Sequence, residues 1–508
     1  MKNRISKLIG LVAMLLCVVM CFSACSSTSG SNLPTSEQVA TDTKTSGNIS
    51  TKENPVKISL DEWIGWWTCL AANGGLKTAP DSINAKNGIY VEYVPMNDPT
   101  ASSSSLIAGE LVGAGYTVNR YAFLQSKFDE AKVPVVMPFI TNFSNGGDGI
   151  IAKSDIINVK DLVGKKIAVP RYSEAQTLVE WLLNNSDLTD SEKKEIRQNM
   201  VFFETADDTA KAFFSGTVDA AATWEPYLTQ AASSTDSRIL FDTSMSTNLI
   251  LDGILFREDF VNANETFVVD WIDGILEAAS LYKNDFASIR QFPMFELMTD
   301  EEIIDMANGA DLALWKQNHE LLNSTAITMY SDMANVWITI GETAFPDKAK
   351  TAFTDKYMEI LREKYEGKEE STVSQNFNDD EKSMLIESPD ALLSYNADIK
   401  FELNSTDIRQ ESYAELDEFV KVAQVLDGVY IQIEGNASQR AKGVTDEKII
   451  KFSEERAHSV EEYFVSKGIS RDRIIVVGNG DSNPLNKEDL AAAENRRTEI
   501  FFKTKMGY

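Results

Sequence analysis

Polar and aromatic residues follow three apolar, strand-like segments of this chain, where they could hold a small solute without reacting with it. The carboxyl ends of parallel strands meet at one edge of a sheet, so we expect these side chains to line one cleft, with Asn119 on its wall. The candidate ligand-binding residues are Trp63, Trp66, Asn119, Arg171, Tyr172, Ser173, Trp224 and Glu225. Each has a structural interpretation too, since a Trp could belong to the core, Arg171 could be solvated, and Ser173 or Glu225 could cap a helix.

The charge of the solute stays open between two interpretations of these residues. Arg171, together with the free N–H groups at the start of the helix that Ser173 opens, favours an oxyanion such as a sulfonate, carboxylate or phosphonate. The Trp and Tyr rings with Glu225 favour a cationic or flat aromatic solute, because cations are attracted to ring faces. We expect a small organic solute with a flat or cationic part.

Catalysis is not expected from this composition. His319 and His458 are the only histidines among 508 residues, and neither stands at the end of a predicted strand. Of four cysteines, we expect only Cys69 to remain as an unmodified thiol in the mature chain, buried as a small hydrophobic residue. We therefore expect no disulfide, no metal site and no cofactor.

The elements that position these residues alternate between strand and helix patterns from Val56 to about Tyr365, which favours parallel sheets in an α/β fold. A helix is predicted at Glu174–Asn184, and mostly helical structure follows from Phe260 to about Lys364. The predicted strands are Val56–Leu60, Tyr90–Pro95, Val133–Phe139, Gly149–Ala152, Lys166–Pro170, Val201–Glu204 and Ala220–Trp224.

A smaller unit with a different order of elements is predicted at 391–508, after a charged, polar linker at 366–390 that contains a helix at Asp379–Ile386. Its predicted elements, in chain order, are a strand at Ala397–Phe401, a helix at Asp407–Leu426, a strand at Val429–Glu434, a helix at Glu447–Lys467, and strands at Ile474–Val477 and Thr498–Lys503.

The first 25 residues have the layout of an export signal. Lys2, Arg4 and Lys7 precede an apolar run at Leu8–Phe22, which is too short for an ordinary membrane-spanning helix. The small residues directly before Cys25 resemble the lipobox of bacterial lipoproteins, which implies cleavage after residue 24 and lipidation of Cys25. A plain signal peptide cut nearby, or an uncleaved anchor, are the alternatives.

The segment that follows is a predicted flexible tether at 25–55, rich in Ser, Thr, Gly and Asn and too poor in apolar residues to fold. The formal net charge of the chain is −29, which repels phosphate backbones and excludes nucleic acid as an expected partner. The same charge argues against adsorption to anionic lipid, so a lipid anchor would have to hold the protein at the membrane.

Residues 56–365 resemble the solute-binding proteins of ABC importers of the nitrate/sulfonate/taurine type. The segments that carry the resemblance are Gly147–Ala152, Ile157–Pro170, Phe213–Ala220 and Trp224–Tyr227. The resemblance implies the type II periplasmic-binding-protein fold, in which two α/β lobes joined by crossing strands close on a ligand. It also implies a small-molecule solute, an ABC permease as partner, no enzymatic activity, and a monomer.

Residues 391–508 resemble the α+β OmpA-type domain that binds peptidoglycan in many envelope proteins. The segments that carry this resemblance are Ile399–Phe401, Ile433–Gly435, Phe452–Val460, Gly468–Ile469, Gly478–Asp481 with Pro484, and Asn495–Ile500. The resemblance places Arg456 where the family clasps the charged end of the stem peptide.

The other half of that peptidoglycan clasp departs from the family pattern. The family's Gly-His-Thr-Asp stands here as Gly435–Ser438, with Asn436 in place of the His and Ser438 in place of the Asp. A weaker site, a different stem-peptide chemistry, and a scaffold without the activity all stay open. Arg456 could also pair with Glu455 or Glu461 on its own helix.

These observations together predict an extracytoplasmic solute-binding lipoprotein. A signal peptide at 1–24 and the tether at 25–55 would precede the solute-binding domain, and the OmpA-like domain could contact peptidoglycan. The protein would lie in the cell envelope, lipid-anchored at the outer face of a bacterial membrane, and deliver its solute to an ABC importer. An envelope sensor or structural wall-binding lipoprotein without a transport role is the alternative, and an enzyme on the same scaffold is a third interpretation.

Overall fold

The computed structural model describes residues 49–282, 285–368, 377–402 and 404–505. The predicted signal peptide, Cys25 and nearly all of the tether lie outside the described residues. In the part of the chain that is described, no helix is both long and apolar enough to span a bilayer.

The first sheet defines lobe 1 and contains parallel and antiparallel strands. Its order is β12-β5-β11-β3-β1-β2, with β1 parallel to β2 and β3, and with β11 antiparallel to β3, β4 and β5. The strands are β1 (Val56–Leu60), β2 (Val91–Pro95), β3 (Gly113–Thr117), β4 (Val135–Val136), β5 (Ile140–Ser144), β11 (Leu251–Arg257) and β12 (Ala310–Leu312).

The second sheet defines lobe 2 and has the order β10-β6-β9-β7-β8. Strand β7 is parallel to β8 and β9, and β6 runs antiparallel to β9 and β10. The strands are β6 (Asp148–Lys153), β7 (Ile167–Pro170), β8 (Met200–Phe203), β9 (Ala220–Trp224) and β10 (Ser237–Asp242).

The chain passes between the lobes twice, from β5 to β6 and back from β10 to β11. Both sheets contain the same strand order, β2-β1-β3-β11 in lobe 1 and β8-β7-β9-β6 in lobe 2. In each, three parallel strands are followed by an antiparallel strand that borders a crossing. This arrangement confirms the predicted bilobed α/β fold. Because both crossings lie beside the carboxyl ends of the parallel strands, those ends face the junction between the lobes.

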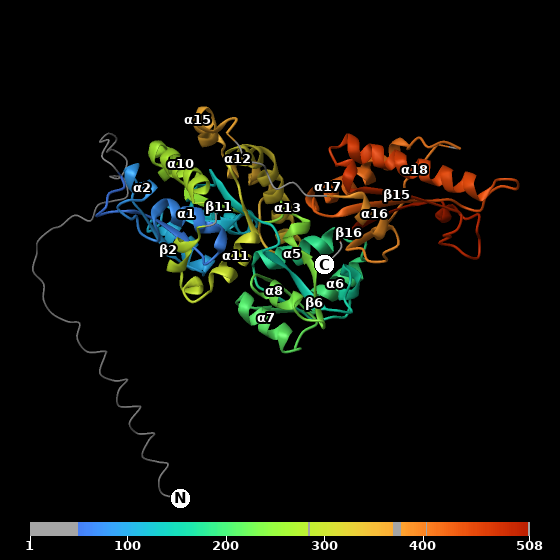
Figure 1. Cartoon of the computed structure of the whole chain (residues 1–508), viewed down its shortest axis with the longest axis horizontal. Coiled ribbons are helices and arrows are strands. Elements are labelled where there is room, and N and C mark those ends of the chain that lie inside the picture. Colours follow the sequence, from blue (N-terminus) through green and yellow to red (C-terminus); the bar gives the residue numbers. More distant parts are fainter. Residues whose placement is uncertain (1–48, 283–284, 369–376, 403, 506–508) are drawn as a thin grey trace, which may run out of the picture. The chain divides into compact units, whose positions relative to one another are not determined.

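Helices flank both sheets. Figure 1 shows α1 and α10 together in lobe 1 and α5 and α8 beside β6 in lobe 2. The helices of these two lobes are α1 (Trp67–Asn73), α2 (Ile83–Lys86), α3 (Pro99–Ala108), α4 (Val118–Ala131), α5 (Glu174–Asn184), α6 (Asp190–Gln198), α7 (Ala206–Phe214), α8 (Tyr227–Ala232), α9 (Glu258–Ala263), α10 (Glu265–Leu281), α11 (Asp300–Asn308), α12 (Trp315–Glu320), α13 (Ala326–Thr339), α14 (Ala349–Ala352) and α15 (Lys356–Tyr365).

Close packing against a tryptophan explains one strand that the apolar pattern misses. Strand β3 reads Gly-Ala-Gly-Tyr-Thr and every residue in it is buried. A Cβ on Gly115 would lie 2.8 Å from the ring of Trp66, so only glycine leaves room for that fully buried indole. The Trp66 ring is thereby held directly below the carboxyl end of β3.

The third sheet belongs to the C-terminal unit and has the order β13-β16-β14-β15. Its elements are α16 (Asp379–Ile386), β13 (Leu393–Ala397), α17 (Tyr413–Val425), β14 (Tyr430–Asn436), α18 (Asp446–Ser466), β15 (Ile474–Gly480) and β16 (Thr498–Lys503). The predicted strand at 397–401 is wrong by four residues, because it is Leu393–Ala397 that pairs with β16. The predicted helix at Asp407–Leu426 begins too early, because α17 starts at Tyr413, and the other predicted elements of this unit are confirmed within three residues.

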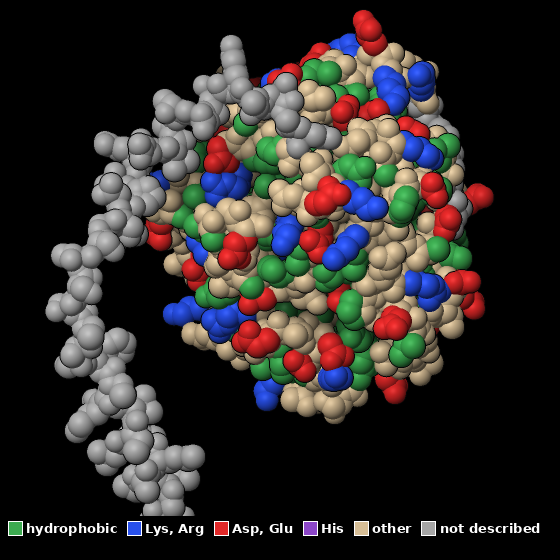
Figure 2. Space-filling view, turned by 90° about the vertical axis from the view of Figure 1, so that its left-hand side faces the viewer, with side chains coloured by type: hydrophobic (Ala, Val, Ile, Leu, Met, Phe, Trp, Pro, Cys, Tyr) green, Lys and Arg blue, Asp and Glu red, His purple; other side chains and the backbone are tan. Residues whose placement is uncertain are grey.

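The acidic excess of the chain is not gathered on the face shown in Figure 2. Asp and Glu side chains are interspersed there with Lys and Arg side chains and with apolar groups. Opposite charges so mixed give that face no strong field of one sign. Acidic side chains do gather at one place, the junction between the two lobes.

Candidate functional site

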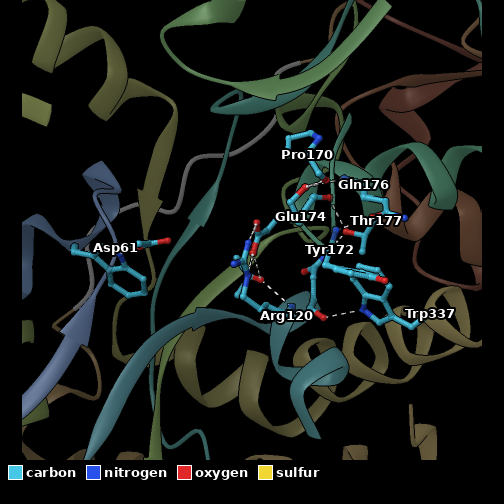
Figure 3. Close-up of polar contacts among 12 residues, drawn as sticks. Asp61, Arg120, Pro170, Tyr172, Glu174, Gln176, Thr177 and Trp337 are labelled. Atoms are coloured by element: carbon cyan, nitrogen blue, oxygen red, sulfur yellow. Dashed lines mark hydrogen bonds and ion pairs between the residues drawn. The ribbon is translucent and has the colours of Figure 1, made fainter. Parts of the chain in front are cut away.

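A buried ion pair joins the two lobes at their junction. Arg120 lies in the first turn of α4 in lobe 1, and Glu174 is the first residue of α5 in lobe 2. The guanidinium donates two hydrogen bonds to the carboxylate, Nε to Oε1 at 2.8 Å and Nη2 to Oε2 at 2.7 Å (Figure 3). Thr117, the N-cap of α4, donates a third at 2.9 Å. The pair therefore occupies the N-terminus of α5, where a bound anion would otherwise lie.

The charge state of Glu174 follows from this pairing. Burial raises the pKa of the Glu174 carboxyl, but the Arg120 guanidinium and the hydrogen bonds outweigh burial and hold the pKa below its usual value. The Arg120 pKa is raised in turn, because its favourable interaction with Glu174 exceeds the cost of burial. Both groups are charged at neutral pH, in a bidentate geometry that is among the strongest that proteins form.

Three further carboxylates surround this ion pair, two of them buried (Asp148 and Asp252) and one exposed (Asp61). Asp61 follows β1, Asp148 is the first residue of β6, and Asp252 is the second residue of β11. Desolvation raises the pKa of all three, to about 7 for Asp148 and well above the ordinary value for Asp252. Their charges act on one another and on Glu174, so they form one electrostatic cluster at the lobe junction.

Asp61 and Asp148 are each held by a neighbouring donor. Trp66 Nε1 donates to Asp61 Oδ1 at 2.6 Å, and Ser144 Oγ donates to Asp148 Oδ2 at 2.7 Å. Asp252 differs, because its Oδ2 atom is buried and makes no hydrogen bond of good geometry within the described residues, although the nearby Trp63 side chain partly offsets the rise in the Asp252 pKa. The register places Asp252 beside Thr117 on β3 and Asn142 on β5, at the floor of the junction.

Trp63 and Trp66 are two of the predicted ligand residues, and both lie at this junction. Trp63 is partly buried and its Nε1 donates to Asn142 Oδ1 at 3.0 Å. Trp66 is fully buried against β3 and donates to Asp61, so its ring belongs to the core while its N–H points to the acidic cluster. A Cβ on Gly65 would lie 2.1 Å from Asn142 Oδ1, which explains the glycine between the two indoles.

Asn119 is the second residue of α4 and is buried between the lobes. Its Nδ2 donates to Thr177 Oγ1 on α5 at 2.8 Å, and its Oδ1 has no partner among the residues described. Its backbone carbonyl accepts from Trp337 Nε1 at 3.1 Å. Asn119 therefore ties α4 to both α5 and α13.

Arg171, Tyr172 and Ser173 form the turn between β7 and α5. Arg171 is exposed, and its guanidinium lies over the Phe202 ring at 4.4 Å. Tyr172, at φ 55°, stacks on Phe123 of lobe 1 at 4.9 Å. Ser173 is the N-cap of α5, accepting from Gln176 N at 3.2 Å.

Trp224 and Glu225 end β9 next to the acidic cluster. Trp224 pairs with Asp148 in the β6–β9 register and is partly buried. The Glu225 carboxylate accepts hydrogen bonds from Thr229, 3.1 Å from its backbone N and 2.8 Å from its Oγ1. Burial raises the Glu225 pKa, and the side chain stabilises the start of α8.

The structure thus adds charged residues that sequence reasoning did not select. Asp61, Asp148, Glu174 and Asp252 are the acids of the junction, and Arg120 is their cation. Asp61 directly follows a predicted strand and Glu174 opens a predicted helix shortly after another, so both could have been chosen by position. Asp252 could not, because β11 was not predicted and its pairing with β3 and β5 depends on residues far away in sequence.

The predicted peptidoglycan residues lie in the C-terminal unit. Arg456 of α18 is stacked between Phe401 and Phe452, at 4.8 and 4.5 Å, and its Nε donates to the Ser405 carbonyl at 3.2 Å. Burial lowers the Arg456 pKa, and the charge of Arg496 adds to that effect.

The alternative partners of Arg456 are engaged elsewhere. Glu461 pairs with Arg471 at 2.9 Å, and the nearest cation to Glu455 is Lys451 at 3.9 Å. Ser438 Oγ accepts from Arg496 Nη1 at 3.3 Å. Asn436 is buried and donates to Glu499 at 2.8 Å, so it is held in the sheet.

One further group could hold a metal ion by its ligand types. His319, Asp355 and Glu359 bring one ligand atom each within 4.8 Å of one another. Both carboxylates have other partners, since Asn323 Nδ2 donates to Asp355 at 2.7 Å and Arg362 pairs with Glu359. We assign no metal to this surface group.

Two families match separate parts of the sequence. Residues 85–285 match the family described as NMT1/THI5 like, and residues 400–498 match the OmpA family. The chain therefore contains an NMT1/THI5-like region and a C-terminal OmpA domain.

Curated relatives match the OmpA region. The outer membrane protein A of Bordetella avium is 37% identical over 108 residues, which are 21% of this chain and 54% of that protein. The peptidoglycan-associated lipoprotein of Pseudomonas putida is 30% identical over 102 residues, 20% of this chain and 59% of that protein. The chain spans about half the length of these relatives and about a third of others.

Solved structures are similar to the bilobed part. The aliphatic sulphonate-binding protein SsuA of Escherichia coli has a TM-score of 0.47 and 17% identity, and covers 58% of this chain and 96% of its own. The nitrate-binding protein NrtA of Synechocystis PCC 6803 has a TM-score of 0.48 and 12% identity, and covers 61% of this chain and 89% of its own.

Proposed function

We propose that this chain is an envelope lipoprotein that binds a small organic solute between its two lobes and delivers it to an ABC importer. The observation that carries the proposal is the cluster of acidic side chains, with Asp148 and Asp252 buried, at the lobe junction, where strand ends of both lobes meet. Burying several carboxylates costs stability, and such a cost is typically tolerated where function requires it. A cluster of this kind in a junction therefore marks a functional site. The match to the NMT1/THI5-like family supports the same function.

The test of solute binding is a thermal-shift and calorimetry screen of the purified full chain. A ligand that binds only the folded state raises its stability by about 2.7 kcal/mol at a hundredfold excess over Kd. The panel contains organic cations, sulfonates, nitrate, amino acids and neutral amides. A saturable shift with a matching calorimetric heat supports the proposal, and a panel with no binder contradicts it.

The lipid anchor is the second part of the proposal and rests on the sequence around Cys25. Metabolic labelling with a fatty-acid probe should mark the wild-type protein and leave the Cys25→Ser variant unlabelled. The variant should also appear in the soluble fraction, because the acyl chains supply the membrane affinity. Equal labelling of both proteins would contradict lipidation at Cys25.

Peptidoglycan contact is the third part. The OmpA match and the side-chain setting of Arg456 support it, since a guanidinium held between two rings is ordered before a carboxylate arrives. Ser438 provides no charge to pair with an ammonium group. We therefore propose a contact that depends on the anionic end of the stem peptide.

A further inference from the structure

The lobe junction gathers four acidic side chains around a single guanidinium. Asp61, Asp148, Glu174 and Asp252 act electrostatically on one another, and in the described part of the chain Arg120 is the cation that they face. Arg120 is committed to Glu174 by two hydrogen bonds. Asp61 and the two buried acids, Asp148 and Asp252, are therefore left without a cation of their own among the described residues.

Asp252 shows that the hydrogen bonds within this cluster do not satisfy all of its acceptors. Its side chain is only 4% exposed, and its Oδ2 makes no hydrogen bond of good geometry among the described residues. Leaving a buried acceptor unpaired costs about 1–3 kcal/mol, and more for a charged group, so a purely structural role would not retain it. A ligand donor that reaches Oδ2 would supply the missing hydrogen bond.

The positions that would serve an anion are already occupied or turned away. The N-terminus of α5 is filled by the carboxylate of Glu174, and the guanidinium of Arg120 is bound to it. Arg171, the other cation near this turn, is exposed and stacked on Phe202. An oxyanion placed here would meet Asp61, Asp148 and Asp252 with no free positive group.

The remaining polar groups of the junction also suit a donor ligand. The two indole N–H groups are used by the protein itself, Trp63 for Asn142 and Trp66 for Asp61. Asn119 Oδ1 is a second buried acceptor without a partner in the described structure. The unsatisfied atoms here are acceptors, and they complement N–H groups of a ligand.

We propose that the lobe junction takes an organic cation with N–H donors, such as an amidinium, guanidinium or primary ammonium compound, and that Asp252 supplies its counter-charge. A bound cation would also favour the ionised forms of Asp61 and Asp148, and the partly buried Trp63 offers an aromatic wall. This inference rests on the proposed solute-binding function and names its ligand class.

The experiment compares three probes of the same shape on the full chain. Benzamidine is cationic at neutral pH, benzamide is neutral and benzenesulfonate is anionic, and all three carry one phenyl ring. Calorimetry measures Kd for each, together with arginine, agmatine, putrescine, methanesulfonate and nitrate. The variants are Asp252→Asn, which keeps the shape and removes the charge, and the control Asp242→Asn. Asp242 is an equally buried carboxylate whose Oδ1 accepts hydrogen bonds from Ser244.

The expected result is binding of at least one cation, about tenfold or more weaker in Asp252→Asn and within about twofold in Asp242→Asn. Binding of a sulfonate, of nitrate or of benzamide as tightly as any cation would overturn the charge assignment and leave the solute-binding function standing. An affinity for a cation that Asp252→Asn leaves unchanged would also overturn it. Failure of every probe would contradict the proposed function itself.

Discussion

At the scale of single residues, Arg120 contributes more to the lobe junction than its one ion pair suggests. It faces Glu174 directly and also lowers the energy of the Asp61 carboxylate. Its replacement leaves several buried acids without a cation, whereas replacement of Glu174 leaves a cation still surrounded by acids. The two halves of this salt bridge should therefore differ in mutational cost.

Arg120→Met should lower the free energy of unfolding by about 3–5 kcal/mol, the range found when one partner of a buried pair is removed. Glu174→Gln should cost clearly less, because it removes one of four mutually repelling carboxylates and keeps the shape. Urea denaturation at pH 7 measures both. Equal losses in the two variants would show that the other acids do not act on Arg120.

The raised pKa of Asp148 predicts how stability changes with pH. The folded chain keeps the Asp148 proton up to about pH 7, while the unfolded chain releases it near the ordinary aspartate pKa of 3.8. The unfolded state thus binds fewer protons between these values, so stability falls as pH rises from about 4 through 7. The Asp148 carboxyl interacts electrostatically with four other acids, which makes the decline of stability with pH steeper. These acids are Asp61, Glu174, Glu225 and Asp252.

Asp148→Asn should therefore flatten the decline in melting temperature between pH 5 and about pH 8, with little change at pH 5. Scanning calorimetry across this range measures it. The control is Asp311→Asn, a half-buried acid of lobe 1 held by Asn145. A decline as steep in Asp148→Asn as in the wild type would contradict the raised pKa of Asp148.

At the scale of elements, Ser173 in the turn from β7 to α5 has two proposed roles that can be tested separately, as a helix cap and as a ligand contact. Its Oγ caps α5, and the predicted ligand contact stays a prediction. Ser173→Ala should lower stability by about 1 kcal/mol. The matched control is Thr189→Ala at the N-cap of α6, a helix remote from the cluster.

Both cap variants should lose similar stability in urea denaturation, and the solute affinity separates the two roles of Ser173. An unchanged Kd in Ser173→Ala assigns the hydroxyl to the helix alone. A loss of about tenfold in Kd, absent from Thr189→Ala, assigns it to the ligand as well.

The elements that the sequence predicts well are those with continuous local patterns. Strand Val56–Leu60, helix Glu174–Asn184 and strand Ala220–Trp224 are found with the same bounds. The missed strands depend on distant partners. Strand β3 is rich in glycine because Trp66 packs against it, and β11 is fixed by its two neighbours in the sheet.

The same limit applies to the site. Positions after predicted strand ends include Trp63 and Trp66, which lie at the lobe junction with Asn119, while the assignment of these residues to a ligand stays a prediction. Asp252 and Asp148 are site candidates because they are buried and repel each other. Sequence alone reveals neither effect, since both depend on the assembly of the two lobes.

At the scale of the whole molecule, the C-terminal unit predicts a second, separate binding activity. Sedimentation with purified peptidoglycan should retain the wild-type chain and lose Arg456→Ala, because the guanidinium is the proposed contact for the stem-peptide carboxylate. Arg471→Ala is the control, since Arg471 is paired with Glu461 and Glu462. Melting temperatures check that loss of stacking on the two rings has not unfolded the unit.

Ser438→Asp should raise the affinity for peptidoglycan that contains a free ammonium group, by restoring the carboxylate of the family pattern. It should leave solute binding between the lobes unchanged. A variant that sediments no better than wild type would show that Arg456 acts without an acidic counterpart. The domain boundaries at 365 and 391 stay predictions, and independent unfolding of the two parts would test them.

The ion pair between Arg120 and Glu174 also affects the kinetics of solute binding. Its two ends belong to different lobes, so the lobes cannot separate without breaking it. A solute must wait for that event, and its rate of capture then depends on the protein's own opening rather than on concentration alone. At high solute concentration the observed association rate should reach a plateau. The plateau value equals the rate constant at which the ion pair breaks and the lobes open.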